Sequence, residues 1–107
     1  MIKRLSPLEL KIHLENSSVQ PLLVDVREPW EFERCSIAGS RLIPMGKIPQ
    51  QIGLLNPDQE IVLICHHGVR SLRVAVFLEQ AGFGQVVNLE GGVDAWAKEI
   101  DLTMAVY

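Results

Sequence analysis

The chain has 107 residues, of which 48% are hydrophobic and 21% are charged, and its formal net charge is −3. This length suits one compact unit, so we expect residues 1–107 to form a single domain. The composition excludes collagen-like, disordered and disulfide-rich classes, and the weak negative charge argues against nucleic-acid or membrane-surface partners.

The first predicted elements are a helix and a strand. Ser6, Pro7 and Glu9 match an N-cap, a proline at the first helical position and a capping box, so a helix begins there. Residues 22–26 form a short apolar run bounded by breakers, which predicts a buried strand. The preceding residues 2–5 are a short apolar-leaning start.

The middle of the chain alternates in the same way. A second helix is expected near residues 28–29, then a very short strand at residues 42–43 and a weak helix over residues 47–55. Residues 61–64 are apolar and partly β-branched, which makes them the best strand candidate. Residues 71–81 are the best helix candidate.

The pattern predicts which side of that helix is buried. Val74, Phe77, Leu78 and Ala81 fall at helical spacing, and Gly82 ends the helix. The larger aromatic side chains are expected in the core or in a pocket wall; they are Trp30, Phe32, Phe77 and Trp96.

The chain closes with a strand at residues 86–89, a turn at residues 91–92 and a helix over residues 93–98. Short apolar strands that alternate with helices predict an α/β fold, with a mostly parallel sheet covered by helices on both faces. In such sheets ligands bind beyond the carboxyl ends of the strands. The residues that follow Ile64 are therefore the first place to look for a site.

That loop carries the residues of a reactive thiol site. It consists of Cys65, His66, His67, Gly68, Val69 and Arg70. Cys65 would lie beside the positive end of the following helix, which favours the thiolate. Gly68 allows a tight turn that directs backbone N–H groups at one point, and Arg70 adds a fixed positive fork for an oxyanion.

The spacing between cysteine and arginine separates two kinds of enzyme. Cysteine-dependent phosphatases have a similar loop but place five residues between the cysteine and the arginine, whereas four lie between Cys65 and Arg70. The shorter loop resembles that of the rhodanese family of sulfurtransferases. Residues 24–32 and the Gly-Gly-x-x-x-Trp pattern within residues 88–96 resemble the family as well, so the likeness covers nearly the whole chain. It implies a mostly parallel five-stranded sheet.

One segment departs from the family pattern. Such families usually carry Gly-His-Ile-Pro-Gly-Ala where residues 35–40 of this chain are Cys-Ser-Ile-Ala-Gly-Ser. The histidine and the proline are replaced, while Ile37 and Gly39 are retained. We expect the change to affect local packing, or a substrate or partner surface, more than catalysis.

The resemblance implies an activity and its partners. Cys65 would take a sulfane sulfur from thiosulfate or a persulfide and pass it to a thiol or cyanide, with ping-pong kinetics and without a cofactor. A second hypothesis is a sulfur carrier that works only with a partner protein. The start of the chain lacks the apolar run of a signal peptide and no apolar stretch could span a bilayer, so we expect a cytoplasmic protein.

Other candidate residues have competing interpretations. His66 and His67 are expected to line the pocket rim, either adding positive charge when protonated or facing solvent, and no metal site is expected. Cys35 is interpreted as a bystander thiol, with a resolving thiol as the alternative. Asp25 and Arg27 predict a structural ion pair at a strand end. His13 is assigned no function.

Overall fold

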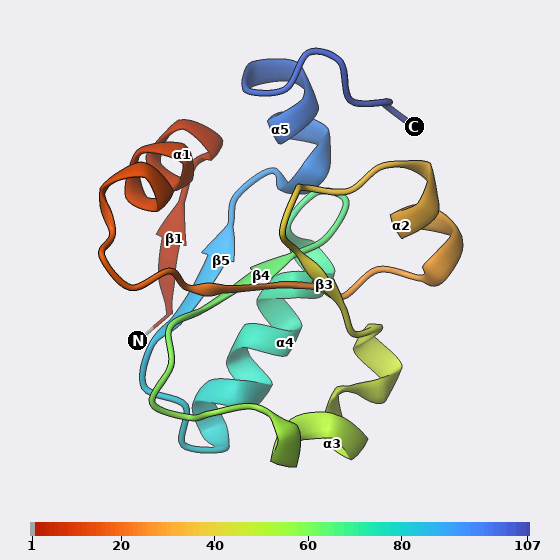
Figure 1. Cartoon of the computed structure of the whole chain (residues 1–107). Helices are drawn as coiled ribbons and strands as arrows, with labels where there is room; N and C mark the ends of the chain where they lie inside the picture. Colours follow the sequence, from red (N-terminus) through yellow and green to blue (C-terminus); the bar gives the residue numbers. More distant parts are fainter. Residues whose placement is uncertain (1) are drawn as a thin grey trace.

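The computed structural model describes residues 2–107, which form a five-stranded sheet between two helical layers (Figure 1). The strands are β1 (Lys3–Leu5), β2 (Leu22–Asp25), β3 (Arg41–Leu42), β4 (Ile61–Ile64) and β5 (Val86–Leu89). Their order is β1-β5-β4-β2-β3, and every neighbouring pair is parallel. The predicted α/β fold is confirmed. Within residues 2–107, no helix has the length and apolar character needed to cross a bilayer.

The helical segments follow the predicted order. They are α1 (Pro7–Asn16), α2 (Pro29–Arg34), η1 (Met45–Lys47), α3 (Ile48–Gln51), η2 (Ile52–Leu54), α4 (Val69–Gln80) and α5 (Gly92–Glu99). The predicted capping box is present, because Glu9 N–H donates to Ser6 Oγ and Ser6 N–H donates to the Glu9 carboxylate. The weak helix expected over residues 47–55 is present as the short α-helix α3 between the 3-10 turns η1 and η2. Pro49 lies in the first turn of α3, where a proline is tolerated.

Helix α4 begins earlier than predicted and buries a different face. Val74 and Leu78 are buried as expected, but Ser71 and Ala75 complete the buried face. Ala81 lies at the exposed C-cap, so its predicted burial is wrong, and Phe77 is 40% exposed and lies outside the core. The loop before α4 sets the rotation of the helix about its axis, and Ser71 is therefore buried.

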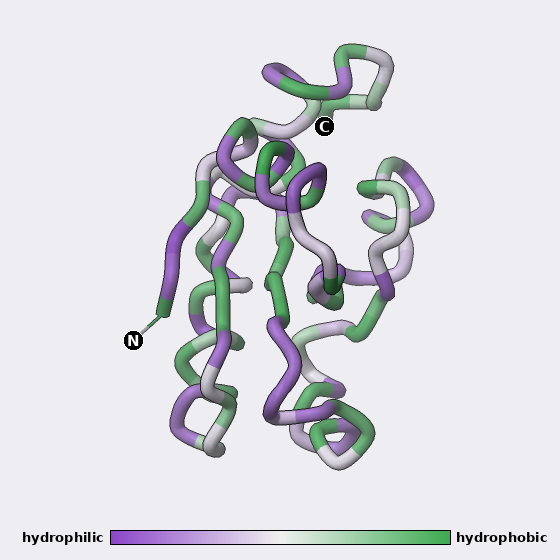
Figure 2. The backbone as a smooth tube through the Cα atoms, turned by 60° about the vertical axis from the view of Figure 1, so that its left-hand side comes forward, coloured by the Kyte–Doolittle hydropathy of each residue, from purple (hydrophilic) through white to green (hydrophobic). Residues whose placement is uncertain are grey.

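The two faces of the sheet form two separate cores. On β4, Ile61 and Leu63 pack with α4 and the segment around α3, while Val62 and Ile64 pack with α1 and α5. This alternation along one strand is the expected result of a sheet covered on both sides. In Figure 2 the hydrophobic colour follows the central strands, whereas the helices mix both colours.

The start of α5 lies directly against the loop that follows β4. Val93 N–H donates to the Cys65 carbonyl at 2.9 Å, and Asp94 N–H donates to the His66 carbonyl at 3.1 Å. Gly92 has φ +59°, and a Cβ atom added there would collide with both of these carbonyl groups. The Gly-Gly turn is therefore what allows α5 to fix the backbone of the candidate loop.

We expect Gly92→Ala to destabilise the protein by about 3 kcal/mol or more, because it combines a positive φ with a backbone collision. Gly53→Ala is the matched control, since nothing lies within 4 Å of an added Cβ and its φ is ordinary. Chemical denaturation of both variants measures the difference. Equal stability of the two variants would contradict the role given to Gly92.

Candidate active site

Cys65 lies at the end of β4 with only 1% of its surface exposed. Its Sγ accepts a hydrogen bond from Gly68 N–H at 3.0 Å. Gly68 has φ +99° and is the N-cap of α4, so the loop turns back over the thiol before the helix begins. The N–H donor and the positive end of α4 both place positive charge beside the sulfur. The predicted turn at Gly68 is therefore present.

Two buried polar side chains, Ser71 and Asn88, lie next to the thiol. Cys65 Sγ lies 3.2 Å from Ser71 Oγ, and Ser71 Oγ donates to Asn88 Oδ1 at 2.5 Å. The Asn88 amide nitrogen donates to the Gly68 carbonyl at 3.2 Å, which fixes the orientation of the amide. Because the Ser71 hydroxyl hydrogen is used on Asn88, Ser71 Oγ can accept from a protonated Cys65 thiol. The two side chains thus link β5, the loop and α4.

Arg70 projects from the first turn of α4 and is paired with Glu31 of α2. The two guanidinium nitrogens donate to the two carboxylate oxygens at 2.7 and 2.8 Å, a bidentate geometry. Glu31 is buried, whereas 32% of the Arg70 side chain is exposed. The hydrogen bonds from Arg70 hold the pKa of Glu31 at about 2, and Glu31 in turn raises the pKa of Arg70. Nη1 and Nη2 of Arg70 both donate to Glu31, so the binding of an oxyanion by this side chain stays a prediction.

The predicted ion pair between Asp25 and Arg27 lies behind this site. Both side chains are fully buried, and the Arg27 guanidinium donates to Asp25 Oδ2 at 2.7 Å through Nη2. Arg27 Nη1 donates to the hydroxyl oxygen of Tyr107 at 2.8 Å, and that hydroxyl donates to Glu31 at 2.8 Å. Burial raises the pKa of Tyr107. The phenol therefore stays protonated at neutral pH and connects the two ion pairs.

His66 and His67 stack on each other with ring centroids 3.9 Å apart. His66 is half-buried and also stacks on Tyr107 at 3.9 Å, whereas His67 is exposed. Burial, together with the neighbouring His67, lowers the pKa of His66, so the ring is neutral at neutral pH. The positive charge expected from His66 is therefore not available at neutral pH. His66 Nε2 is shielded from solvent and has no hydrogen-bond partner among residues 2–107.

Asp94 brings a third potential metal ligand to the histidines. One ligand atom from each of His66, His67 and Asp94 lies within 4.8 Å of the others. These three groups could hold a divalent ion, although the Asp94 carboxylate already accepts from Lys98 at 3.0 Å. The absence of a metal stays a prediction, and the sequence had not indicated Asp94.

The remaining candidates lie away from the thiol loop or on its outside. Val69 opens α4 with an exposed side chain. Cys35 is a half-buried free thiol, and its Sγ lies 3.8 Å from Arg27 Nη1. His13 contacts Glu60 at 2.7 Å, which fits the absence of an assigned function. In the divergent segment over residues 35–40, Ile37 packs in the core shared with α1 and α5.

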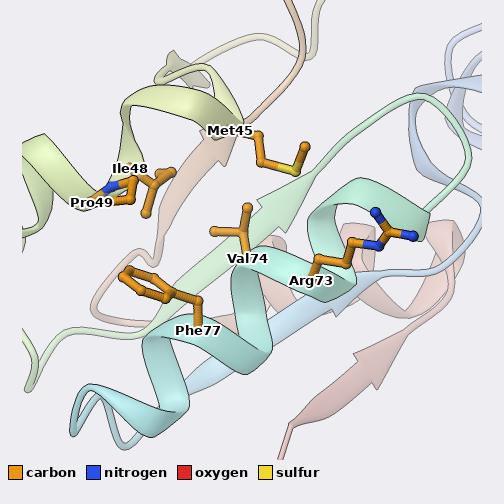
Figure 3. A pocket seen from close by; sticks show the side chains of 6 residues that line it. All are labelled: Met45, Ile48, Pro49, Arg73, Val74 and Phe77. Carbon is orange, nitrogen blue, oxygen red and sulfur yellow. The ribbon is translucent and has the colours of Figure 1, made fainter.

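An apolar groove of about 200 Å³ lies between α4 and the segment around α3. Figure 3 shows Val74 and Phe77 facing Met45 and Ile48, while Arg73 extends away from Phe77. Phe77 thus forms a pocket wall, whereas Trp30, at 61% exposure, is neither buried nor part of this groove. None of residues 65–70 line the groove, so it is separate from the thiol site.

The sequence missed four residues that shape the site. They are Glu31, Ser71, Asn88 and Tyr107. An asparagine inside the apolar run of residues 86–89 was an available indication, because a buried polar side chain needs partners. Tyr107 offered no such indication, since no local pattern relates it to residues about eighty positions earlier.

The comparisons with known proteins agree on one family. The model of the rhodanese-like domain matches residues 6–99. The "Sulfurtransferase" of Allochromatium vinosum is 39% identical over 77 residues, covering 72% of each chain. The "Probable adenylyltransferase/sulfurtransferase MoeZ" of Mycobacterium tuberculosis is 39% identical over 105 residues, covering 96% of this chain. This chain spans only 26% of the length of MoeZ. The crystal structure of a rhodanese-like domain protein from Staphylococcus aureus superposes with a TM-score of 0.84, at 34% identity and 99% coverage of both chains.

The Glu31 carboxylate predicts a pH dependence of stability. Its pKa is about 2 in the folded protein against an ordinary value of 4.5, mainly because of the hydrogen bonds from Arg70, so the contacts of the ionised carboxylate stabilise the fold above pH 4.5 by about 3 kcal/mol. This contribution decreases as the pH falls from 4.5 towards 2. We expect Glu31→Gln to lose stability at neutral pH and to lose less at pH 3, measured by denaturant unfolding.

The control is Glu33→Gln, which changes an exposed carboxylate on the same helix. It should leave the stability at neutral pH nearly unchanged. A stability difference between Glu31→Gln and wild type that did not vary with pH would contradict the pairing.

Proposed function

Because the chain belongs to the rhodanese-like family of sulfurtransferases, we propose that it carries a sulfane sulfur on Cys65. The donor is a small anion such as thiosulfate, or a persulfide, and the acceptor is a thiol or cyanide. The observation that carries this proposal is the environment of Cys65 Sγ, which accepts from Gly68 N–H at the start of α4. Free thiols at both cysteines fit a reducing compartment such as the cytoplasm.

The transfer takes two displacement steps. The Cys65 thiolate attacks the outer sulfur of thiosulfate, so that a bond forms between the two sulfurs while the original sulfur–sulfur bond breaks. Sulfite leaves with the bonding electron pair. The acceptor then attacks the outer sulfur of the Cys65 persulfide, and the Cys65 thiolate is regenerated. Each step forms one bond to the transferred sulfur and breaks another, so the two steps need no external oxidant or reductant.

The loop has features that suit a charged sulfur on Cys65. Gly68 N–H already points at Sγ, and the first turn of α4 adds N–H groups without intrahelical partners. Arg70 lies close enough for the charge of Cys65 to raise its pKa further. Positive charge from the backbone and from Arg70 would stabilise an anionic donor and the leaving sulfite. Four residues lie between Cys65 and Arg70, which resembles the spacing of the sulfurtransferase loop and differs from the five residues of the phosphatase loop.

The alternative is a sulfur carrier that works only within a partner complex. The comparison with MoeZ supports this alternative: this chain matches only 26% of the length of MoeZ, so a domain of this kind can form part of a larger protein. An isolated domain of this type would accept sulfur from a protein persulfide but would not turn over thiosulfate. Sulfur transfer measured with each of these two donors therefore separates an independent enzyme from a carrier that depends on a partner.

We expect Cys65→Ala to abolish thiocyanate formation from thiosulfate and cyanide, because the only sulfur-carrying atom is removed. Cys35→Ser is the matched control, and its rate should stay within about threefold of wild type if Cys35 is a bystander. Loss of activity in folded Cys35→Ser would identify Cys35 as a second functional thiol. Activity that survives in Cys65→Ala would overturn the proposal.

We expect Arg70→Ala to raise the KM for thiosulfate by about tenfold or more, with a smaller change in kcat, because a fixed positive charge at the rim is lost. Arg73→Ala removes an exposed arginine one turn further along α4 and should leave KM nearly unchanged. Steady-state kinetics at varied thiosulfate measure both. An unchanged KM for Arg70→Ala would rule out its role in donor binding.

A further inference from the structure

Tyr107, the single tyrosine of the chain, lies in the tail that follows α5 and reaches back to the thiol site. The tail is held by Met104 and Tyr107, which pack against the core shared with α1 and α5. The Tyr107 ring stacks on His66 with an interplanar angle of 3° and meets the edge of Trp30 at 5.9 Å. A residue distant in the sequence thus contacts both the catalytic loop and α2.

The Tyr107 hydroxyl joins two ion pairs into one chain of groups. It accepts from Arg27, which is paired with Asp25, and it donates to Glu31, which is paired with Arg70. Both contacts of the hydroxyl are 2.8 Å long. Charges therefore alternate from the buried pair at the end of β2 to the partly exposed Arg70 in the first turn of α4, with one neutral phenol at the centre.

The donation to Glu31 affects how much charge Arg70 can present. Glu31 accepts two hydrogen bonds from Arg70, one from Glu28 N–H at 3.0 Å and one from Tyr107. Every hydrogen-bond donor to Glu31 other than Arg70 balances part of the negative charge of the carboxylate. The positive charge of the Arg70 guanidinium is then less completely neutralised and can act on other groups. Without the phenol, only Arg70 and Glu28 N–H would balance the charge of the Glu31 carboxylate, so a larger share of it would fall on Arg70.

We propose that Tyr107 is a positioning residue that sets the selectivity of the Cys65 pocket for anionic reagents. Its hydroxyl holds Glu31 in place and thereby controls the positive charge that Arg70 presents at the thiol. This inference rests on the proposed function for its biological meaning, because thiosulfate is an anion. The electrostatic effect itself is a property of the pocket and is measurable without any sulfur transfer.

The test compares alkylation of Cys65 by iodoacetate, an anion, and by iodoacetamide, its neutral analogue. Peptide mapping of the full chain gives the rate at Cys65 separately from that at Cys35. We expect Tyr107→Phe, which keeps the ring and removes the hydroxyl, to lower the iodoacetate-to-iodoacetamide rate ratio by about threefold or more. The KM for thiosulfate should rise by a similar factor.

Two further variants make the result specific. Thr103→Val removes a hydroxyl whose contact is with Asp101 of the same tail, and it should leave the ratio unchanged. Glu31→Gln removes the negative charge that faces Arg70, and it should raise the ratio instead of lowering it. Arg70→Ala should give the lowest ratio.

The outcomes separate the two proposals. A lowered ratio in Tyr107→Phe, with thermal unfolding like that of wild type, supports the positioning role even if thiosulfate is not turned over. An unchanged ratio in Tyr107→Phe overturns it, even if sulfur transfer is confirmed. If Tyr107→Phe is unstable at the assay temperature, the ratio is measured at a lower temperature at which the variant is folded, and an unchanged ratio there overturns the positioning role. In Glu31→Gln, a ratio that falls or stays constant contradicts control of the pocket by this ion pair.

Discussion

The site depends on the contact between the first turn of α5 and the loop after β4. Gly92 allows the two backbones to approach, so that the amides of Val93 and Asp94 hold the carbonyls of Cys65 and His66. These hydrogen bonds fix the backbone of the loop, in which Gly68 N–H donates to the sulfur. The paired glycines are therefore a condition for the cradle, although they lie on a different strand–helix unit.

Charge is organised around the sulfur in two layers. Next to Cys65, the contacts are short and local, from Gly68 N–H and the Ser71 hydroxyl. Further out, two ion pairs form a series of alternating charges. It begins at the buried pair of Asp25 and Arg27 and ends at the partly exposed Arg70, which is paired with Glu31. The inner layer suits a sulfur atom on Cys65, while the outer layer controls which charged molecules approach it.

The sequence predicted what local patterns determine. The strands at residues 61–64 and 86–89 have the predicted bounds, because short and mostly apolar runs between breakers mark buried parallel strands. The loop at residues 65–70 could be predicted because its functional residues are consecutive in the sequence. The buried face of α4 and the exposure of Trp30 were predicted wrongly, since packing of neighbouring segments decides both. Glu31 lies 39 residues from Arg70, and such tertiary pairing leaves no trace in local spacing.

Whether Cys65 carries the transferred sulfur is measured by intact-protein mass spectrometry. We expect incubation with thiosulfate to add the mass of one sulfur atom to wild type but not to Cys65→Ala, and a thiol acceptor to remove it. A protein persulfide donor is used in parallel, so that a carrier dependent on a partner would also be detected. An adduct that persists in Cys65→Ala, or no adduct from either donor, would contradict the proposal.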